Sequence, residues 1–317
     1  MNIGSSSARC IAAWMLTLAT GICAQAPAED FPVTIEHKFG ETTISAEPER
    51  IVSVGYTEQD DLFALGKAPI AIRPWGTPVP HGVWPWAEAA AGEAEPVVLG
   101  SGPLDFETIA ELEPDLIIGI YAGITREDYD RLSLIAPTVL QPADYVDYAT
   151  PWEEQTRIIG RAVGKADEAN ALVEGIKKRF EQTQAEHPEF VGKTVAAAFY
   201  WDGQVGAYAS GEPRSRFFTE LGFVIPEIYD EEAGDAFYAT FSLERIHLLD
   251  VDFLAWYWDS PVGALETEEI VRLRKTLAAH QDGREMTLPS RLRWALSFSS
   301  PLSLDYALDE LVPVLAE

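Results

Sequence analysis

The chain has 317 residues, of which 47% are hydrophobic and 23% charged, so it is long enough for two domains and its composition excludes an intrinsically disordered protein. Its 51 acidic and 23 basic residues give a formal net charge of −28. A field of that sign repels phosphate backbones and anionic lipids, which excludes nucleic acid and the membrane surface as favoured partners.

The first residues have the pattern of an export signal. Arg9 precedes an uncharged and mainly apolar stretch over residues 10–24, and residues 24–26 and 26–28 both match the small-x-small pattern of a cleavage site. The apolar stretch is too short to span a bilayer comfortably. We therefore expect a signal peptide over residues 1–26 that is removed on export to the periplasm or the cell envelope.

Both cysteines of the chain, Cys10 and Cys23, lie inside this segment. Once the segment is removed, the chain would have no disulfide and no cysteine-ligated metal. Cys23 is an alternative site for a lipid anchor, but the residue before a lipidated cysteine is normally small and here it is Ile22.

The next part of the chain alternates short apolar strands with helices. The predicted elements are strands at 33–37 and 41–44, a strand at 50–54, a helix at 58–65, a strand at 69–72, a helix at 107–112 and a strand at 115–119. This alternation is typical of a parallel sheet covered by helices on both faces. We therefore expect an N-terminal α/β lobe over residues 31–163.

Two consecutive helices are predicted next, at 152–163 and 166–187. In the second, apolar residues recur at spacings of three and four and form one stripe. These residues are Ala169, Leu172, Val173, Ile176 and Phe180. A helix of this length runs about 30 Å, which is enough to cross from one domain to another, and Pro188 ends it.

The alternation resumes after this helix. The predicted elements are a strand at 194–200, a helix at 216–221, strands at 253–258 and 293–298, and a helix at 303–315. They indicate a second α/β lobe over residues 190–317. The expected fold class is therefore α/β, with two Rossmann-like lobes joined by a single long α-helix over 166–187 and a ligand cleft between the lobes.

The two halves share a local pattern. In both, a glutamate, an isoleucine, a leucine and an aspartate fall at the same offsets, from Glu107 to Asp115 and from Glu244 to Asp252. Each glutamate stands in the first turn of a helix, where the helix N-terminus favours an anion. The pattern supports two related lobes, although the glutamates could be no more than helix caps.

The sequence contains no enzyme motif. Residues 160–166 resemble a phosphate-binding loop but are one residue short and lack its Ser or Thr, and neither G-x-S-x-G nor H-E-x-x-H occurs. The histidines lack ligand spacing; they are His37, His81, His187, His247 and His280. We therefore expect a protein that is not an enzyme and has no cofactor or metal of its own.

Aromatic and arginine side chains follow the predicted strands. Ligands of open α/β sheets bind beyond the carboxyl ends of the strands, and flat rings with a few cations suit a bulky, partly apolar ligand with oxygen acceptors. The candidate ligand-binding residues are Tyr56, Arg73, Trp75, Tyr121, Trp201, Tyr257 and Trp258. Core packing explains any single one of these aromatics equally well, so they point to a ligand only as a group.

Several segments, taken in order, resemble one known family. They are residues 48–54, 62–66, 106–118, 129–139, the helix that begins at Trp152, and 216–223. Together they are similar to the periplasmic siderophore- and vitamin-binding proteins of ABC importers, and in particular to the ferric-siderophore branch.

This resemblance implies a shallow cleft between two lobes bridged by one rigid helix. It implies a monomer that captures a ferric siderophore and delivers it to an ABC permease and its ATPase. It also implies that Glu107 and Glu244 lie on the exposed rims, one on each lobe, and dock onto arginines of the permease. Cobalamin and haem are alternative ligands for the same scaffold. A surface sensor or adhesion module and an exported metallochaperone are alternatives of other classes.

Overall fold

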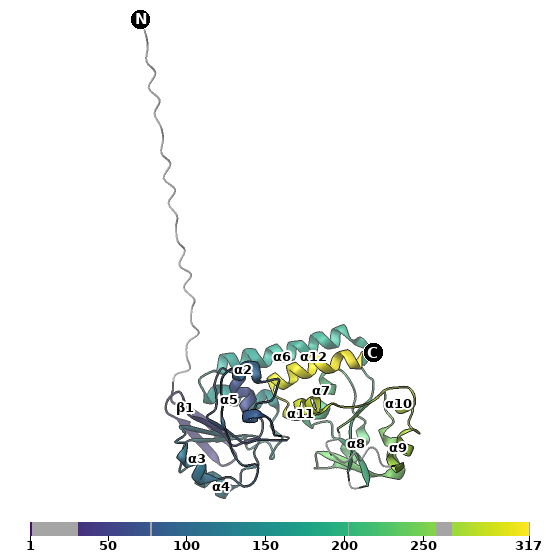
Figure 1. Cartoon of the computed structure of the whole chain (residues 1–317), viewed down its shortest axis with the longest axis horizontal. Coiled ribbons are helices and arrows are strands. Elements are labelled where there is room, and N and C mark those ends of the chain that lie inside the picture. The colour runs from purple at the N-terminus through teal and green to yellow at the C-terminus, as the bar shows by residue number, and fades with distance from the viewer. Residues whose placement is uncertain (2–30, 77, 202, 258–267, 317) are drawn as a thin grey trace.

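Two sheets, one built from each half of the chain, form the framework of the protein (Figure 1). The computed structural model describes Met1 and residues 31–76, 78–201, 203–257 and 268–316. Apart from Met1, the expected signal peptide lies outside the described residues, and so do Cys10 and Cys23.

The first sheet is parallel throughout and has the strand order β5-β4-β3-β6-β7. Its strands are β3 (Ile51–Ser53), β4 (Ala71–Ile72), β5 (Val97–Val98), β6 (Leu116–Gly119) and β7 (Thr138–Leu140). The helices between them are α1 (Glu58–Ala64), the 3-10 turn η1 (Pro80–Gly82), α2 (Glu88–Ala91), α3 (Phe106–Glu111) and α4 (Arg126–Leu132). A separate antiparallel hairpin precedes the sheet, with β1 (Val33–His37) and β2 (Gly40–Ile44).

The apolar character of β6 follows from burial on both faces of this sheet. Leu116 and Ile118 belong to one apolar cluster, which includes Leu62 of α1. Ile117 points to the opposite face and belongs to a second cluster, which includes Ile109 of α3. Alternate residues of a strand face opposite sides, so a strand covered on both sides has no polar position.

The second sheet has the strand order β10-β9-β8-β11-β12. Its strands are β8 (Val195–Trp201), β9 (Gln204–Tyr208), β10 (Tyr238–Ser242), β11 (Phe253–Trp256) and β12 (Glu285–Thr287). The first three pair antiparallel, while β8, β11 and β12 run parallel. The helices of this half are α7 (Pro213–Glu220), α8 (Glu227–Ala233), the 3-10 helix η3 (Leu243–Leu249), α9 (Glu268–Arg274) and α10 (Ala278–Gln281).

One predicted element of this half is wrong. Residues 293–298, expected as a strand, form the end of helix α11 (Ser290–Phe298). Leu292, Ala295 and Leu296 are buried at helical spacing, and Pro289 stands directly before the first turn. Periodicity alone does not separate a helix from a strand in so short an apolar run.

The two halves are connected by α6 (Ala166–Glu186). A short loop joins α6 to the preceding helix, α5 (Trp152–Ala162). The long connecting helix expected from the sequence is thus confirmed, and the 3-10 turn η2 (Pro188–Phe190) ends it. Figure 1 shows α6 in teal, running past both sheets with the C-terminal helix α12 (Pro301–Leu315) in yellow beside it. Arg179 of α6 pairs with Asp305 and Asp309 of α12, so the connection consists of two helices held together.

Aromatic rings from the two halves also contact one another and form what we call the aromatic seam. It consists of Trp75, Trp84 and Trp86 from the first half with Trp294, Phe298 and Tyr306 from the second. The largest apolar cluster of the described residues therefore contains side chains from both halves. Within the described residues, no helix combines the length and the apolar character needed to cross a membrane.

Candidate ligand-binding site

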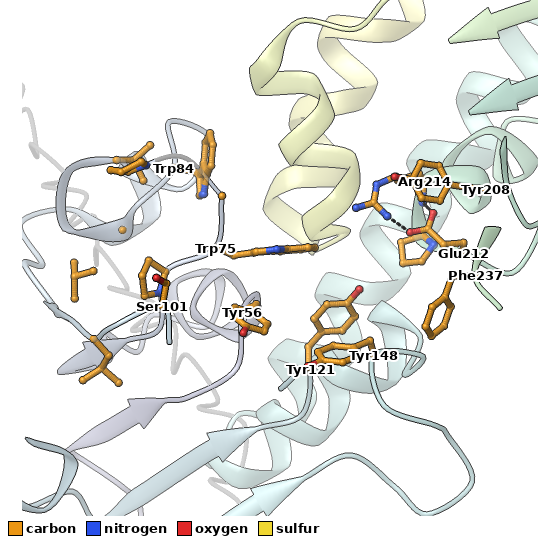
Figure 2. Close-up of a pocket in the computed structure, with 18 of the residues that line it drawn as sticks. Tyr56, Trp75, Trp84, Ser101, Tyr121, Tyr148, Tyr208, Glu212, Arg214 and Phe237 are labelled. Atoms are coloured by element: carbon orange, nitrogen blue, oxygen red, sulfur yellow. Dashed lines mark hydrogen bonds and ion pairs between the residues drawn. The ribbon is translucent and has the colours of Figure 1, made fainter. Parts of the chain in front are cut away.

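A cleft of about 750 Å³ lies between the two halves of the chain. Its volume falls within the range of known small-molecule sites. Eight of its 19 described lining residues are aromatic, and Figure 2 shows rings on both sides of the cleft. The aromatic lining residues are Tyr56, Trp75, Trp84, Tyr121 and Tyr148 from the first half and Tyr208, Phe237 and Tyr238 from the second.

Tyr56 and Tyr121 stand where the strand order of the first sheet reverses. β3 and β6 are neighbours in the sheet. β4 and β5, which follow β3 in the chain, extend the sheet to one side, and β7, which follows β6, extends it to the other. A ligand crevice forms beyond the carboxyl ends of the strands at such a point. Here the backbone N–H of Tyr56 donates to the carbonyl of Tyr121 at 3.1 Å, which holds the two residues side by side.

Glu58 fixes this end of the sheet. Its buried carboxylate accepts hydrogen bonds from the backbone N–H groups of Thr57 at 3.0 Å and Tyr121 at 2.7 Å. Burial raises the pKa of Glu58, and the backbone donors oppose that shift. Gly55 leaves the necessary space, because a Cβ there would lie 1.8 Å from a Glu58 carboxylate oxygen. The turn from β3 into α1 therefore positions a cleft tyrosine of another loop.

Trp75 belongs both to the lining of the cleft and to the aromatic seam. Its ring stacks on Phe298 with centroids 5.6 Å apart and meets Trp294 at 5.5 Å. The next residue, Gly76, has a φ of +86°, and a Cβ there would approach the Trp294 ring to 2.7 Å. Only glycine combines that backbone conformation with so close an approach. The loop after β4 is therefore held against α11, and Trp75 is presented to the cleft.

The opposite wall contains an ion pair at the start of α7. Glu212 caps this helix, accepting from the backbone N–H of Arg214 at 2.8 Å, and its side chain also pairs with the Arg214 guanidinium. Arg214 donates through Nε to Ser297 Oγ at 3.0 Å and lies 4.4 Å over the ring of Tyr208. Both residues line the cleft, and the Arg214 side chain, at 16% exposed, offers more surface than that of Glu212, at 4%.

The titratable groups of the cleft are strongly affected by their surroundings. Burial raises the pKa of Glu212, and the adjacent Arg214 opposes that shift. Burial disfavours the charge of Arg214, but Glu212 and the neighbouring tyrosines raise its pKa overall. Burial also raises the pKa of Tyr121 and Tyr208, so both phenols keep their protons and can donate hydrogen bonds.

Four of the residues predicted from the sequence lie at the cleft or directly behind it. Tyr56, Trp75 and Tyr121 line it together, with Trp75 5.9 Å from Tyr56 and 5.8 Å from Tyr121 between ring centroids. Arg73 is behind Tyr56, with its guanidinium 4.5 Å over that ring and Nη2 donating to the carbonyl of Gly102 at 2.9 Å. Arg73 is not among the lining residues. Contact with a ligand stays a prediction for all four.

The other three predicted residues are placed differently. Tyr257 is buried in a second layer, where its ring meets the lining residue Tyr208 at 5.7 Å. Trp201 is 69% exposed at the end of β8 and is not among the lining residues of the cleft. Trp258 lies outside the described residues. Contact with a ligand stays a prediction for these three residues as well.

Sequence reasoning missed seven aromatic or charged side chains of the cleft: Trp84, Tyr148, Tyr208, Glu212, Arg214, Phe237 and Tyr238. Tyr208 ends β9, which was not predicted although Val205 and Ala207 alternate with less apolar positions. Trp84 and Tyr148 stand on loops with no regular pattern. For Glu212 and Arg214 the available signal was Pro213, because a proline after a capping residue often starts a helix.

The repeated pattern of the two halves is found at equivalent places in the fold. Asp115 accepts from the backbone N–H groups of Glu49 and Arg50 before β3, and Asp252 accepts from that of Thr194 before β8. Both aspartates thus tie a loop to the start of a central strand. Glu107 and Glu244 are exposed in the first turns of α3 and η3. Their role in docking stays a prediction.

The described residues contain no group of three or more His, Cys, Asp or Glu side chains that could hold a metal ion.

Comparison with known proteins identifies the relatives of the chain. The sequence profile of the periplasmic binding protein family matches residues 51–291. The probable siderophore-binding lipoprotein YfiY of Bacillus subtilis is 28% identical over 247 residues, which are 74% of this chain and 72% of YfiY. The Fe(3+) dicitrate-binding periplasmic protein FecB of Escherichia coli is 28% identical over 205 residues, 62% of this chain and 63% of FecB.

Solved structures agree with the sequence comparison. A periplasmic solute binding protein from Mycobacterium smegmatis superposes with a TM-score of 0.79 at 35% identity, over 90% of this chain and 97% of that one. PiaA of Streptococcus pneumoniae, solved in complex with ferrichrome, gives a TM-score of 0.73 at 27% identity, over 89% and 97%.

Proposed function

Because this chain belongs to the periplasmic binding protein family, we propose that it captures a ferric siderophore and delivers it to the permease of an ABC importer. The observation that carries the proposal is the aromatic cleft of about 750 Å³ between the two halves. A ferric siderophore is a bulky chelate with an apolar periphery and oxygen acceptors. Flat rings and phenol hydroxyls complement such a ligand. Two relatives, YfiY and PiaA, are named for or were solved with a siderophore.

The proposal extends to the path of the protein in the cell. Residues 1–26 would act as a signal peptide and place the protein in the periplasm or the cell envelope, with a lipid anchor at Cys23 as the alternative. The relatives include both forms, since YfiY is named a lipoprotein and FecB a periplasmic protein.

The proposal also assigns parts to the chain. Residues 31–163 and 190–317 would be the two lobes, with residues 166–187 as the helix between them. The protein would work as a monomer without catalytic activity. Glu107 and Glu244, both exposed, would contact the permease, which acts with its ATPase.

Tryptophan fluorescence of the purified protein tests the ligand class. Trp75 and Trp84 line the cleft, so a bound ferric chelate should quench their emission. The panel contains ferric hydroxamates, ferric catecholates, ferric citrate, haem and cobalamin. Saturable quenching by at least one ferric siderophore is expected. Saturable quenching by haem or cobalamin alone, or by no member of the panel, would overturn the proposal.

A further inference from the structure

The ionised side chains of the cleft neutralise each other. Among the described residues that line it, only Glu212 and Arg214 carry charge at neutral pH. The Arg214 guanidinium pairs with the Glu212 carboxylate, which also accepts from the Arg214 backbone N–H at 2.8 Å. Figure 2 shows the pair on one wall, facing Tyr121 and Trp75. The site therefore presents to a ligand aromatic rings, phenol hydroxyls and an arginine whose charge is balanced by a glutamate.

No other described cation lines the cleft. Arg73 lies behind Tyr56 and donates to the carbonyl of Gly102. Arg216, on α7, pairs with Glu153 and Glu220. Of the segments outside the described residues, Thr77, Asp202 and residues 258–267 include no Lys, Arg or His, and Arg9 belongs to the expected signal peptide.

A site with balanced charge would distinguish ferric chelates by their net charge. A catecholate or citrate complex carries net negative charge and would enter a site whose arginine is already paired with a carboxylate. The net charge of −28 adds repulsion over a longer range. A ferric trihydroxamate without net charge needs no counter-ion and exposes oxygens to which the phenols of Tyr121 and Tyr208 can donate.

Resting on the proposed function, we infer that the ligand is a ferric chelate without net negative charge, and that Glu212 determines this specificity by neutralising Arg214. Glu212 would disfavour anionic chelates, because Arg214 without its carboxylate partner would attract them. Because its side chain is only 4% exposed, it would do so mainly through Arg214.

The test is a titration of the purified protein with ferrichrome, which is uncharged, and with ferric enterobactin, which is trianionic. Ferrioxamine B acylated with an acetyl or a succinyl group provides a second pair that shares one iron core and differs in charge. The wild type should bind ferrichrome more tightly than ferric enterobactin by about tenfold or more. Its affinity for ferrichrome should change little between low and high salt.

Variants of the pair separate charge from shape. In Glu212→Gln the cap acceptor remains while the carboxylate charge is lost, so the preference should shift toward ferric enterobactin by about tenfold at low salt. The double variant E212Q/R214Q is neutral again. It should bind more weakly overall and return to the preference for uncharged chelates, which keeps the test valid if the single variant folds poorly.

The outcomes distinguish this inference from the proposed function. Binding of ferric enterobactin as tight as that of ferrichrome would overturn the inference on charge and leave the proposed function standing. An unchanged preference in a folded E212Q variant would overturn the role of Glu212. Failure of every ferric chelate to bind would overturn the proposed function itself.

Discussion

Tyr148 is the cleft residue whose backbone is held in the least common conformation. It has a φ of +67°, a region that bulky side chains seldom adopt. Its hydroxyl donates to the carbonyl of Ala122 at 3.2 Å, and its ring lies 5.2 Å from Tyr121 and 6.4 Å from Tyr56. The strained conformation therefore places a third tyrosine beside the pair at the ends of β3 and β6.

We expect Tyr148→Ala to weaken binding of the ferric chelate by about 1–3 kcal/mol, as for a partly buried aromatic contact. The matched control is Tyr145→Ala, three residues earlier on the same loop, because Tyr145 is half-buried but does not line the cleft. Isothermal titration of both variants gives the comparison. Equal losses of affinity would mean that the loop as a whole, and not the Tyr148 ring, is responsible.

A second prediction at this scale concerns two buried carboxyl groups in the first turn of α1. Asp61 accepts from Gln155 Nε2 at 2.8 Å and from Thr156 Oγ1 at 2.6 Å, and burial raises its pKa from 3.8 to about 7. Asp60 accepts from Trp86 and Ser300, and burial raises its pKa to about 6. At a pH between 3.8 and these raised pKa values, the two carboxyl groups are protonated in the folded protein and ionised in the unfolded chain.

The free energy of unfolding should therefore fall as the pH rises from about 4 to about 7, because a raised pKa contributes stability only while the folded state keeps the extra proton. Asp61→Asn should reduce this slope, and Asp60→Asn should reduce it by less. Denaturant unfolding of the wild type and both variants at several pH values measures the slopes. A slope in Asp61→Asn equal to that of the wild type would contradict the assignment.

At the scale of elements, the contact between α5 and α6 depends on a single glycine. A Cβ at Gly160 would lie 2.3 Å from the Cβ of Ala169 and 2.9 Å from the carbonyl oxygen of Lys165. Gly175, in the middle of α6, has no atom within 4 Å of such a Cβ and is exposed. The two glycines therefore form a matched pair in neighbouring helices.

Gly160→Ala should destabilise the protein by about 1–3 kcal/mol, because two tightly packed helices would have to separate. Gly175→Ala should stabilise it by up to about 1 kcal/mol, because alanine favours the helix and meets nothing. Thermal or denaturant unfolding gives both values. If the free energy of unfolding changed with the same sign in both variants, packing at Gly160 would not be the cause of the change in stability.

The elements that sequence predicted best are those whose pattern is local. The spacing of the apolar residues within α6 predicts that helix, and a short apolar run between turns predicts β6. β9 and β10 were missed because their residues become a strand pair only through each other and through β8. The same reason explains why only part of the cleft was predicted. Tyr56, Trp75 and Tyr121 follow parallel strands that the sequence predicts, while Tyr208 ends β9, an antiparallel strand that it does not predict.

At the scale of the whole molecule, the exposed glutamates of the two halves lead to a prediction about transport. Glu107→Ala and Glu244→Ala should leave ligand affinity and folding unchanged, because an exposed ion pair contributes only about 0–1 kcal/mol. Uptake should nevertheless slow, with the double variant slower than either and the double Arg variant slowest, since like charges would then face the permease.

Uptake of a radiolabelled ferric chelate by cells, beside titration of the purified variants, measures both effects. Glu111→Ala is the control, because Glu111 is exposed on the same helix as Glu107. Normal uptake by a stable double Arg variant would show that the two carboxylates only cap their helices.

The aromatic seam also determines how the protein comes apart. If the halves separated, Trp84 and Trp86 would lose the rings of Trp294 and Phe298, and the Ser300 hydroxyl would leave the buried Asp60 carboxylate. Exposure of that much aromatic surface, with the loss of one hydrogen bond to Asp60, is unfavourable enough to couple the two halves. On heating, both sheets should therefore melt in one cooperative step, and neither half expressed by itself should be a stable folding unit.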